Sequence, residues 1–427
     1  VLLLILFPAA SIAEAYISNK AGGKNVWYQL HNSPHAMYQN GKTYLVFHGG
    51  GEDYLDPLIV SYDHSSKQVV GPIKVGDNPL SDLSDEHGNP AVMVDALGHI
   101  HVFFGGHGNI GKMIHAVSKH PNDISTWRII ENINPKATYP QLLRTSDGTI
   151  YYFYRKGNHR DDWVFVTSSD NGLTFNHETS VIQAGTKRLD KRYHESPYYD
   201  SWYSVFWLDR NDTIHHVTRY HACANDYKSP YHLERRVNVY YMKKDHKSDY
   251  WTSLAGDKLQ TPVTREAADK CCRLFLSDPP KGEGNVRKII FSGFDVDEAG
   301  RPYIVFGHGK GLNGRTDRSW ELAIGDSKNN NWSFKKLPHG GQLTIEKDGS
   351  LRLWSSKVKQ SHDQGKSWKT MSTIKRGGFS GISLVVNGRA NARVIGYDHW
   401  RETKDFSKRK VFLWGDQGFI TSKNATR

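Results

Sequence analysis

Ser361-His-Asp-Gln-Gly-Lys-Ser-Trp368 fits the pattern S-x-D-x-G-x-[ST]-W in full, and Ser168-Ser-Asp-Asn-Gly-Leu-Thr-Phe175 fits it with Phe in place of Trp. In such a stretch the carboxylate caps its own turn and the glycine supplies a left-handed residue. The closing aromatic side chain packs under a hairpin. We therefore expect Asp170 and Asp363 to be structural residues of hairpin turns and not catalytic ones.

A second repeat runs along the whole chain. A short turn rich in Gly, Asn or Asp comes directly before an apolar stretch of strand-like residues, and the turn chemistry agrees with the strand that follows. Seven such strands are expected, at residues 43–47, 100–104, 150–154, 213–217, 303–306, 351–354 and 392–395. Each step between copies holds about four short strands, the size of one propeller blade. The sequence predicts an all-β fold, a seven-bladed β-propeller in one domain (16–427) with a rim insertion at about 220–288.

Charge and composition limit the class of partner. The chain of 427 residues has a formal net charge of +12 and 12% aromatic residues. This balance favours an anionic partner through long-range attraction. The positive charge is scattered, with no long Lys/Arg run, so an acidic polysaccharide is favoured over nucleic acid or a membrane surface. We expect a monomer.

The first residues have the character of an export signal. Residues 1–15 form an apolar core followed by small residues, with Ala13-Glu-Ala15 as an A-x-A pattern. This is typical of a secretory signal peptide that lacks its initiator Met and basic head. The sequence predicts a secreted protein, extracellular or periplasmic, that starts near Tyr16.

Four residues at strand ends are candidates for chemistry. His87 precedes one expected strand and His107, flanked by glycines, ends the next. Tyr139 and Arg155 have the spacing of the two ends of another hairpin. Arg155 follows four aromatic residues of a strand that should be buried, and an arginine in such a place is expected to bind an anion. Each residue also has a plain structural interpretation, as a hydrogen-bonded loop histidine or as an arginine in an internal salt bridge.

Weaker candidates for substrate binding lie at other strand ends. They are Arg192, Tyr193, His308 and Lys310. For each of them singly, an ordinary solvated loop residue is the simpler interpretation.

The string His87-Gly-Asn-Pro90, Gly105-Gly-His-Gly108, Thr138-Tyr-Pro-Gln141 and Tyr152-Phe-Tyr-Arg155 resembles the BNR-4 type propellers. These include the ulvan lyases of polysaccharide lyase families 24 and 25, and family 25 is the more similar. His87, His107, Tyr139 and Arg155 each match a position that the family uses, and Tyr193 matches less distinctively. The resemblance implies a lyase that cleaves a uronate polysaccharide, ulvan, by β-elimination. The scheme below requires no catalytic metal or other cofactor.

The residue types suit that reaction. Arg155 would neutralise the C5 carboxylate, because a guanidinium fork fits a carboxylate in two hydrogen bonds. Tyr139 would be the base and also a candidate acid, and the two histidines would hold the carboxylate or move the proton. A phenol with a resting pKa of about 10 needs nearby positive charge to ionise. Three alternatives remain: a sialidase-like glycoside hydrolase, a non-catalytic propeller that binds anionic glycans, and a lyase for another uronate polymer.

The chain has three cysteines, Cys223, Cys271 and Cys272, all within the expected insertion. With His221 they contain the ligand types of a closed structural zinc site. One disulfide and one free thiol is the alternative. The resemblance to zinc-bearing ulvan lyases favours zinc.

Overall fold

The computed structural model describes residues 17–21, 30–49, 56–82, 85–189, 197–224, 235–278, 286–310, 316–373, 379–398 and 409–420. The expected signal peptide and the candidates Arg192 and Tyr193 lie outside these ranges. Within them, no helix is long and apolar enough to span a bilayer.

In the described part of the chain the strands form six antiparallel or mixed sheets, four of them with four strands each. The first two of these four are β6 (Ala91–Val94), β7 (Ile100–Phe104), β8 (Ile114–Ser118), β9 (Trp127–Ile130), and β10 (Thr138–Arg144), β11 (Ile150–Arg155), β12 (Trp163–Ser168), β13 (Thr179–Ile182). The other two are β21 (Lys288–Val296), β22 (Pro302–Lys310), β23 (Thr316–Asp326), β24 (Asn331–Leu337), and β25 (Gln342–Ile345), β26 (Leu351–Trp354), β27 (Lys357–Ser361), β28 (Lys369–Thr373).

Two sheets are larger. The seven-stranded sheet contains β14 (Lys187–Arg188), β15 (Tyr198–Leu208), β16 (Thr213–Ala224), β17 (Arg236–Asp245), β18 (Trp251–Thr252), β19 (Lys258–Leu259) and β20 (Arg273–Phe275). The nine-stranded sheet contains β1 (Ser18–Ala21), β2 (Ala36–Gln39), β3 (Lys42–Gly49), β4 (Asp56–Asp63), β5 (Val69–Lys74), β29 (Phe379–Arg389), β30 (Ala392–Asp398), β31 (Arg409–Gly415) and β32 (Gly418–Phe419). In it, β2 pairs in parallel with β29, so the beginning and the end of the chain close on each other.

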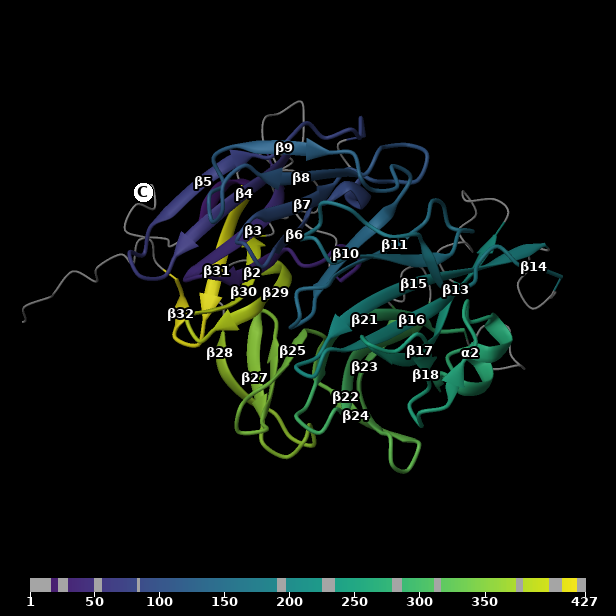
Figure 1. Ribbon diagram of the computed structural model, residues 1–427. Helices are drawn as coiled ribbons and strands as arrows, with labels where there is room; N and C mark the ends of the chain where they lie inside the picture. Colours follow the sequence, from purple (N-terminus) through teal and green to yellow (C-terminus); the bar gives the residue numbers. More distant parts are fainter. Residues whose placement is uncertain are drawn as a thin grey trace, which may run out of the picture.

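The sheets are arranged as a β-propeller. In Figure 1 the labels β2, β6, β10, β15, β21, β25 and β29 ring the middle of the molecule, and the later strands of each sheet lie farther out. Neighbouring sheets pack face to face, and β11 shows how. Tyr152 belongs to the core shared with β7, whereas Phe153 stacks on Phe206 of β15 with ring centroids 4.0 Å apart. Successive side chains of a strand point to opposite faces, so one aromatic strand serves two cores.

Both sequence repeats correspond to turns between strands. The Gly, Asn or Asp turns join the first strand of a sheet to the second, as at Gly148 between β10 and β11, where φ is +90°. The octapeptide turns join the third strand to the fourth. Asp363 accepts hydrogen bonds from Ser361 Oγ, the Ser367 amide and Ser367 Oγ at 2.6–2.9 Å, and Asp170 makes the equivalent set. The predicted structural role of these aspartates is confirmed.

In its described ranges, the expected rim insertion contains strands, one helix and irregular segments. It includes the end of β16, the strands β17 to β20 and the helix α2 (Arg265–Cys271). A short 3-10 helix, η1 (Glu86–Gly88), lies in another part of the chain, before β6. Thr264 caps α2, because its side chain accepts a hydrogen bond from the Ala267 amide. β20 pairs with β17, so this part of the chain widens one sheet, and Figure 1 shows α2 at its outer side.

Candidate active site

The four main candidates lie together at one end of two neighbouring hairpins, β6–β7 and β10–β11. His87 lies in η1 directly before β6, and His107 follows β7. Tyr139 is the second residue of β10, and Arg155 is the last residue of β11. The His87 ring centroid is 5.2 Å from that of Tyr139, and the Arg155 guanidinium carbon is 4.8 Å from the Tyr139 centroid. This geometry brings the four candidates together, and their catalytic roles stay a prediction.

The backbone around Tyr139 is irregular in a way that aims its side chain. Tyr139 has φ of +65°, a rare value for a bulky residue, and the register of β10 against β11 shifts between Thr138 and Gln141. Thr138 Oγ1 accepts a hydrogen bond from the Gly108 amide and donates one to the Gly157 carbonyl. Strained backbone of this kind gathers at functional sites. The bulge therefore fixes Tyr139 between the His107 loop and the end of β11.

Asp85 joins the two histidines, and the sequence analysis did not assign it a role. Its Oδ1 is 2.5 Å from His87 Nδ1, and its Oδ2 is 2.5 Å from His107 Nδ1. The two imidazoles stack with centroids 3.7 Å apart and planes 9° apart. Burial alone would raise the pKa of Asp85, but the hydrogen bonds from His107 and His87 outweigh it and hold that pKa well below its usual range. Burial lowers the pKa of His87, and Asp85 opposes this shift in part.

Arg155 is a fully buried cation, with an exposed fraction of 0%. Its Nε donates a long hydrogen bond of 3.4 Å to the Gly157 carbonyl. Neither Nη atom has a hydrogen-bond partner among the described residues. A buried guanidinium with unsatisfied donors is costly, so the site is built for an anion that accepts from both Nη groups.

A second group of aromatic and cationic residues borders the cluster and was missed in the sequence. Tyr203 of β15 has its ring 6.1 Å from that of Tyr139. Arg236 Nη2 donates to Tyr203 Oη at 2.7 Å, and Arg219 lies 5.0 Å from the Tyr203 ring. His31 lies 5.6 Å from Tyr139, and burial together with Arg219 lowers its pKa well below the usual value. These residues come from distant parts of the chain, so no local motif marks them.

His308 and Lys310 are not joined to the cluster by any contact of the described residues. His308 accepts a hydrogen bond from Arg287 Nε at 2.6 Å, lies 3.5 Å from a Glu321 oxygen and packs on Phe275. Lys310 ends β22 and is partly exposed. Their expected role in substrate binding stays a prediction.

The expected zinc ligands are only partly brought together. Two groups of three possible ligands occur among the residues that the structure describes, namely Asp85/His87/His107 and His159/His221/Cys223. In the second group the ligand atoms lie within 4.8 Å of one another. Imidazole and thiolate are ligand types of zinc, so these residues fit the metal and would supply three of the four ligands of a closed structural site.

Cys271 and Cys272 lie outside that group, which corrects the expected ligand set. Cys271 ends α2 and is exposed, whereas Cys272 is the C-cap of α2 and is buried in the core. Burial raises the pKa of the Cys272 thiol to about 12, which disfavours the thiolate that a metal requires. All three cysteines lie in described ranges and form no disulfide, so the disulfide alternative is wrong.

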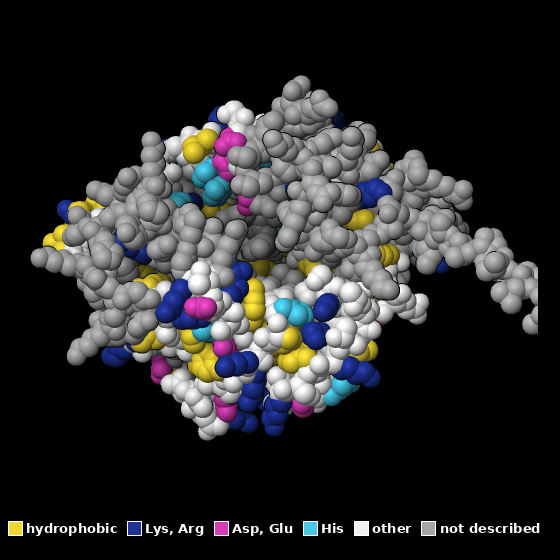
Figure 2. Space-filling model, turned by 180° about the vertical axis from the view of Figure 1, so that it is seen from behind, with side chains coloured by type: hydrophobic (Ala, Val, Ile, Leu, Met, Phe, Trp, Pro, Cys, Tyr) yellow, Lys and Arg dark blue, Asp and Glu magenta, His cyan; other side chains and the backbone are white. Residues whose placement is uncertain are grey.

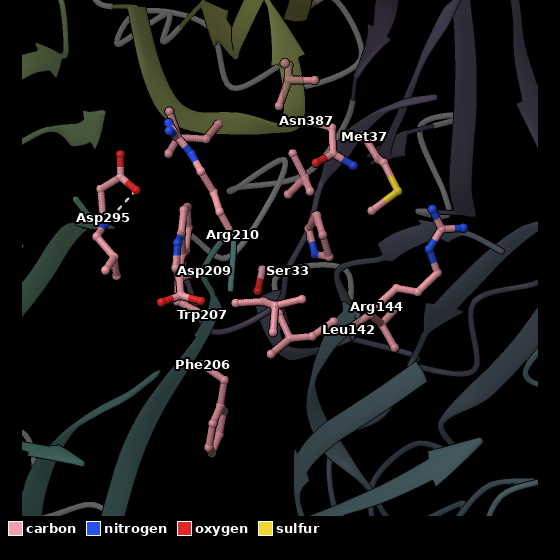
Figure 3. A pocket seen from close by; sticks show the side chains of 18 of the residues that line it. Ser33, Met37, Leu142, Arg144, Phe206, Trp207, Asp209, Arg210, Asp295 and Asn387 are labelled. Atoms are coloured by element: carbon pink, nitrogen blue, oxygen red, sulfur yellow. Dashed lines mark hydrogen bonds between the residues drawn. The ribbon is translucent and has the colours of Figure 1, made fainter. Parts of the chain in front are cut away.

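Two cavities lie toward opposite ends of the innermost strands of the sheets. The larger of the two, about 690 Å³, is lined by Leu142, Phe206, Asp295 and Asn387, which lie in the later halves of their strands (Figure 3). Tyr139 lies near the start of β10, and none of the four clustered residues lines this rear cavity. The front cavity, of about 350 Å³, is lined by residues that start β21, β25 and β29, and by Trp320. It therefore lies on the same face as the cluster.

Charge on the described surface fits an anionic ligand only in a general way. Lys and Arg side chains are scattered among Asp and Glu side chains in Figure 2, in keeping with the net charge of +12. Among the buried cations of the described residues, Arg155 is the one that lies in the cluster.

Fold and site together define a β-propeller enzyme for an anionic substrate. Residues 37–340 match the family model described as BNR repeat-containing family member. The chain is 32% identical to an ulvan lyase of Nonlabens ulvanivorans over 95% of this chain and 90% of that protein. It is 36% identical to an ulvan lyase, PL25, of Pseudoalteromonas sp. (strain PLSV), over 91% of this chain and 83% of that protein.

Solved structures agree with these relatives. A PL25 ulvan lyase bound to -[GlcA(1-4)Rha3S]- superposes with a TM-score of 0.83 at 28% identity, covering 96% of this chain and 98% of that chain. The polysaccharide lyase Uly1 shares the fold at 12% identity, with a TM-score of 0.66. The chain belongs to the BNR repeat-containing family and, within it, to the ulvan lyases, which are polysaccharide lyases.

Proposed function

We propose that this lyase cleaves ulvan by β-elimination at a uronate and leaves an unsaturated uronate at the new non-reducing end. The buried Arg155, with both Nη atoms unpaired among the described residues, is the observation that supports this most strongly. A uronate carboxylate can accept from both Nη groups in the fork geometry. The glucuronate unit in the ligand of the related solved structure supports the same substrate class.

The positions of the cluster residues support a division of labour. Arg155 neutralises the C5 carboxylate, so that the C5 proton becomes acidic and the enolate-like state is stabilised. Tyr139 takes the C5 proton as a phenolate, which the Arg155 guanidinium 4.8 Å from its ring stabilises. The histidine pair supplies the proton for the leaving oxygen. No step requires a metal ion.

The wider organisation is part of the proposal. We propose seven blades, in which β2 to β5 and β29 to β31 with β1 are two separate blades and each of the other five sheets is one; the parallel β2–β29 pair, where the two would meet, supports this division. We propose a secreted, monomeric enzyme with a structural zinc ion at His159, His221 and Cys223. This metal group adjoins the active site, because the His221 ring is 5.5 Å from the Tyr203 ring.

The front cavity supports a polymeric substrate. Trp320 lies across Gly307 and against Gly340, where a Cβ atom would come within about 3.0 and 2.4 Å of the indole. The two glycines thus leave room for a large aromatic wall on the face that holds the cluster. We propose that sugars beyond the cleaved bond lie along this wall, since aromatic side chains suit carbohydrate faces.

Product mass tests the reaction type. Elimination gives ulvan fragments one water lighter than hydrolysis does, so fragments of hydrolysis mass would establish the glycoside hydrolase alternative. No fragments together with retained ulvan binding would establish the binding propeller. We expect Tyr139→Phe to abolish the light fragments. Tyr152→Phe is the matched control, because Tyr152 is equally buried and its hydroxyl has no hydrogen-bond partner among the described residues.

A further inference from the structure

The carboxylate of Asp85 is placed to control which nitrogen of each active-site histidine carries the proton. Its side chain is only 8% exposed, whereas those of His87 and His107 are 23% and 19% exposed. Each carboxylate oxygen faces one Nδ1 atom at 2.5 Å. An ionised carboxylate only accepts hydrogen bonds, so both Nδ1 atoms must be donors.

We propose that Asp85 is the positioning residue that fixes His87 and His107 as Nδ1–H tautomers, and so presents two Nε2 acceptor atoms to the substrate. The stacked rings share one carboxylate, so both Nε2 atoms lie on the side away from Asp85. This inference rests on the proposed function and assigns the histidines their part in it.

Beyond the two Nδ1 protons, the group of Asp85, His87 and His107 can hold one further proton and not two. Two imidazolium rings with centroids 3.7 Å apart repel each other, and one carboxylate offsets one positive charge. Arg155 adds positive charge near His87, and buried His48 is the further titratable group whose pKa Asp85 affects. The pair is therefore a store for a single proton at Nε2, beside Tyr139.

A complete proton cycle follows from this store. Tyr139 passes its phenolic proton to an Nε2 atom, which gives a phenolate next to Arg155 and an imidazolium next to Asp85. The phenolate takes the C5 proton, the C4–O4 bond breaks as the C4–C5 double bond forms, and the imidazolium protonates the leaving O4. Tyr139 and the histidine pair end the cycle as they began, so no external acid or base is consumed.

Asp85→Asn tests the positioning role. An amide oxygen accepts from one Nδ1–H, but the amide nitrogen donates and requires the other ring to change to the Nε2–H tautomer. Asn is as good a helix cap as Asp, so the hydrogen bond from the His87 amide to residue 85 is retained. We expect kcat to fall about 10²- to 10⁴-fold with little change in KM, the range for lost acid–base catalysis.

The direct readout is the tautomer itself, from long-range ¹H–¹⁵N correlation spectra of the histidine rings in the full-length protein without substrate. We expect Nδ1–H signals for both His87 and His107 in the wild type, and one Nε2–H ring in Asp85→Asn. Asp209→Asn is the matched control, because Asp209 makes a 3.1 Å hydrogen bond to His215 away from the cluster and its loss should leave kcat unchanged.

Two results would overturn the inference. One is a wild-type spectrum in which either ring lacks the Nδ1 proton, as a metal ion bound by the three groups would also produce. The other is an Asp85→Asn protein that shows the tautomer change but keeps its kcat. If the wild type lacks lyase activity while its tautomers are as expected, the proposed function fails and the assignment of Asp85 as the tautomer-setting residue stands.

Discussion

Replacing Arg155 by Met should make the protein more stable and inactive at the same time. The side chain is fully buried, and its two Nη groups have no hydrogen-bond partner among the described residues. Met has similar length and no charge, so it removes the unsatisfied donors without leaving a large cavity. A residue retained for substrate binding alone is expected to behave in this way.

The size of the effect follows from two opposing contributions. Each buried unpaired polar group costs about 1–3 kcal/mol, so removing two Nη groups stabilises by about 2–6 kcal/mol. The variant loses the contact between the guanidinium and the Tyr139 ring, worth about 0.5–2 kcal/mol. It also loses the 3.4 Å hydrogen bond to Gly157, worth about 1 kcal/mol. The net gain is on the order of 2 kcal/mol in the free energy of unfolding.

Thermal unfolding followed by circular dichroism, with and without glucuronate, measures both parts of this prediction. We expect Arg155→Met to unfold at a higher temperature than the wild type without ligand. Glucuronate should raise the unfolding temperature of the wild type and not that of the variant, because a ligand stabilises only the state that binds it.

Arg144→Met is the matched control for Arg155→Met. Arg144 donates to the Val94 carbonyl at 2.6 Å and to Gln39 Oε1 at 2.9 Å, so its loss should destabilise the protein. An Arg155→Met variant that is less stable than the wild type by 1 kcal/mol or more would refute the reasoning, since it would mean that the guanidinium is satisfied in the folded protein.

Three further predictions concern the core, the front cavity and the metal group. His216 is fully buried against Phe206, and burial lowers its pKa to about 3, so only the unfolded chain binds a proton at this residue between pH 6.5 and pH 5. The wild type therefore loses about 2 kcal/mol of its free energy of unfolding over that range because of His216. His216→Phe should lack this loss in urea unfolding, and an unchanged pH dependence would contradict the prediction. Trp320→Ala should raise KM for the polymer about 5-fold through the loss of roughly 1 kcal/mol of sugar contact and leave kcat unchanged, and an equal KM would exclude a sugar at this wall. The protein should contain about one zinc ion. Cys223→Ser should lose both the ion and part of the protein's stability, whereas Cys271→Ser should keep the ion. Metal analysis that shows the reverse would restore Cys271 as a ligand.

Local patterns predicted a large part of the fold and of the site. The turn glycines and the capped octapeptides are determined by residues within one turn, so Gly148 and Asp363 lie where the sequence places them. His107 and Arg155 follow from the same logic, because His107 comes shortly after β7 and Arg155 ends β11, and the repeats predict the positions of both strands. His87 and Tyr139 precede or begin the strands that pair with these two, β6 and β10.

Residues whose role depends on pairing between distant strands could not be found in this way. Tyr203, Arg219 and Arg236 come together through the register of β15, β16 and β17, and His31 comes from the far end of the chain. The complete set of metal ligands could not be predicted for the same reason, because His159 follows β11 and comes close to Cys223 only through the packing of two sheets. Asp85 is different: it stands two residues before His87, and an acidic residue at that spacing was a signal available in the sequence.

Absorbance near ~235 nm during incubation with ulvan tests the central claim most directly, because that band reports the unsaturated uronate formed when a base removes the C5 proton and the leaving oxygen is protonated. Heparin-type and pectic uronates are the control substrates. The account predicts a rise with ulvan that disappears in Arg155→Ala and Tyr139→Phe. A rise that persists in Arg155→Ala, or a flat trace for the wild type on ulvan, would contradict it.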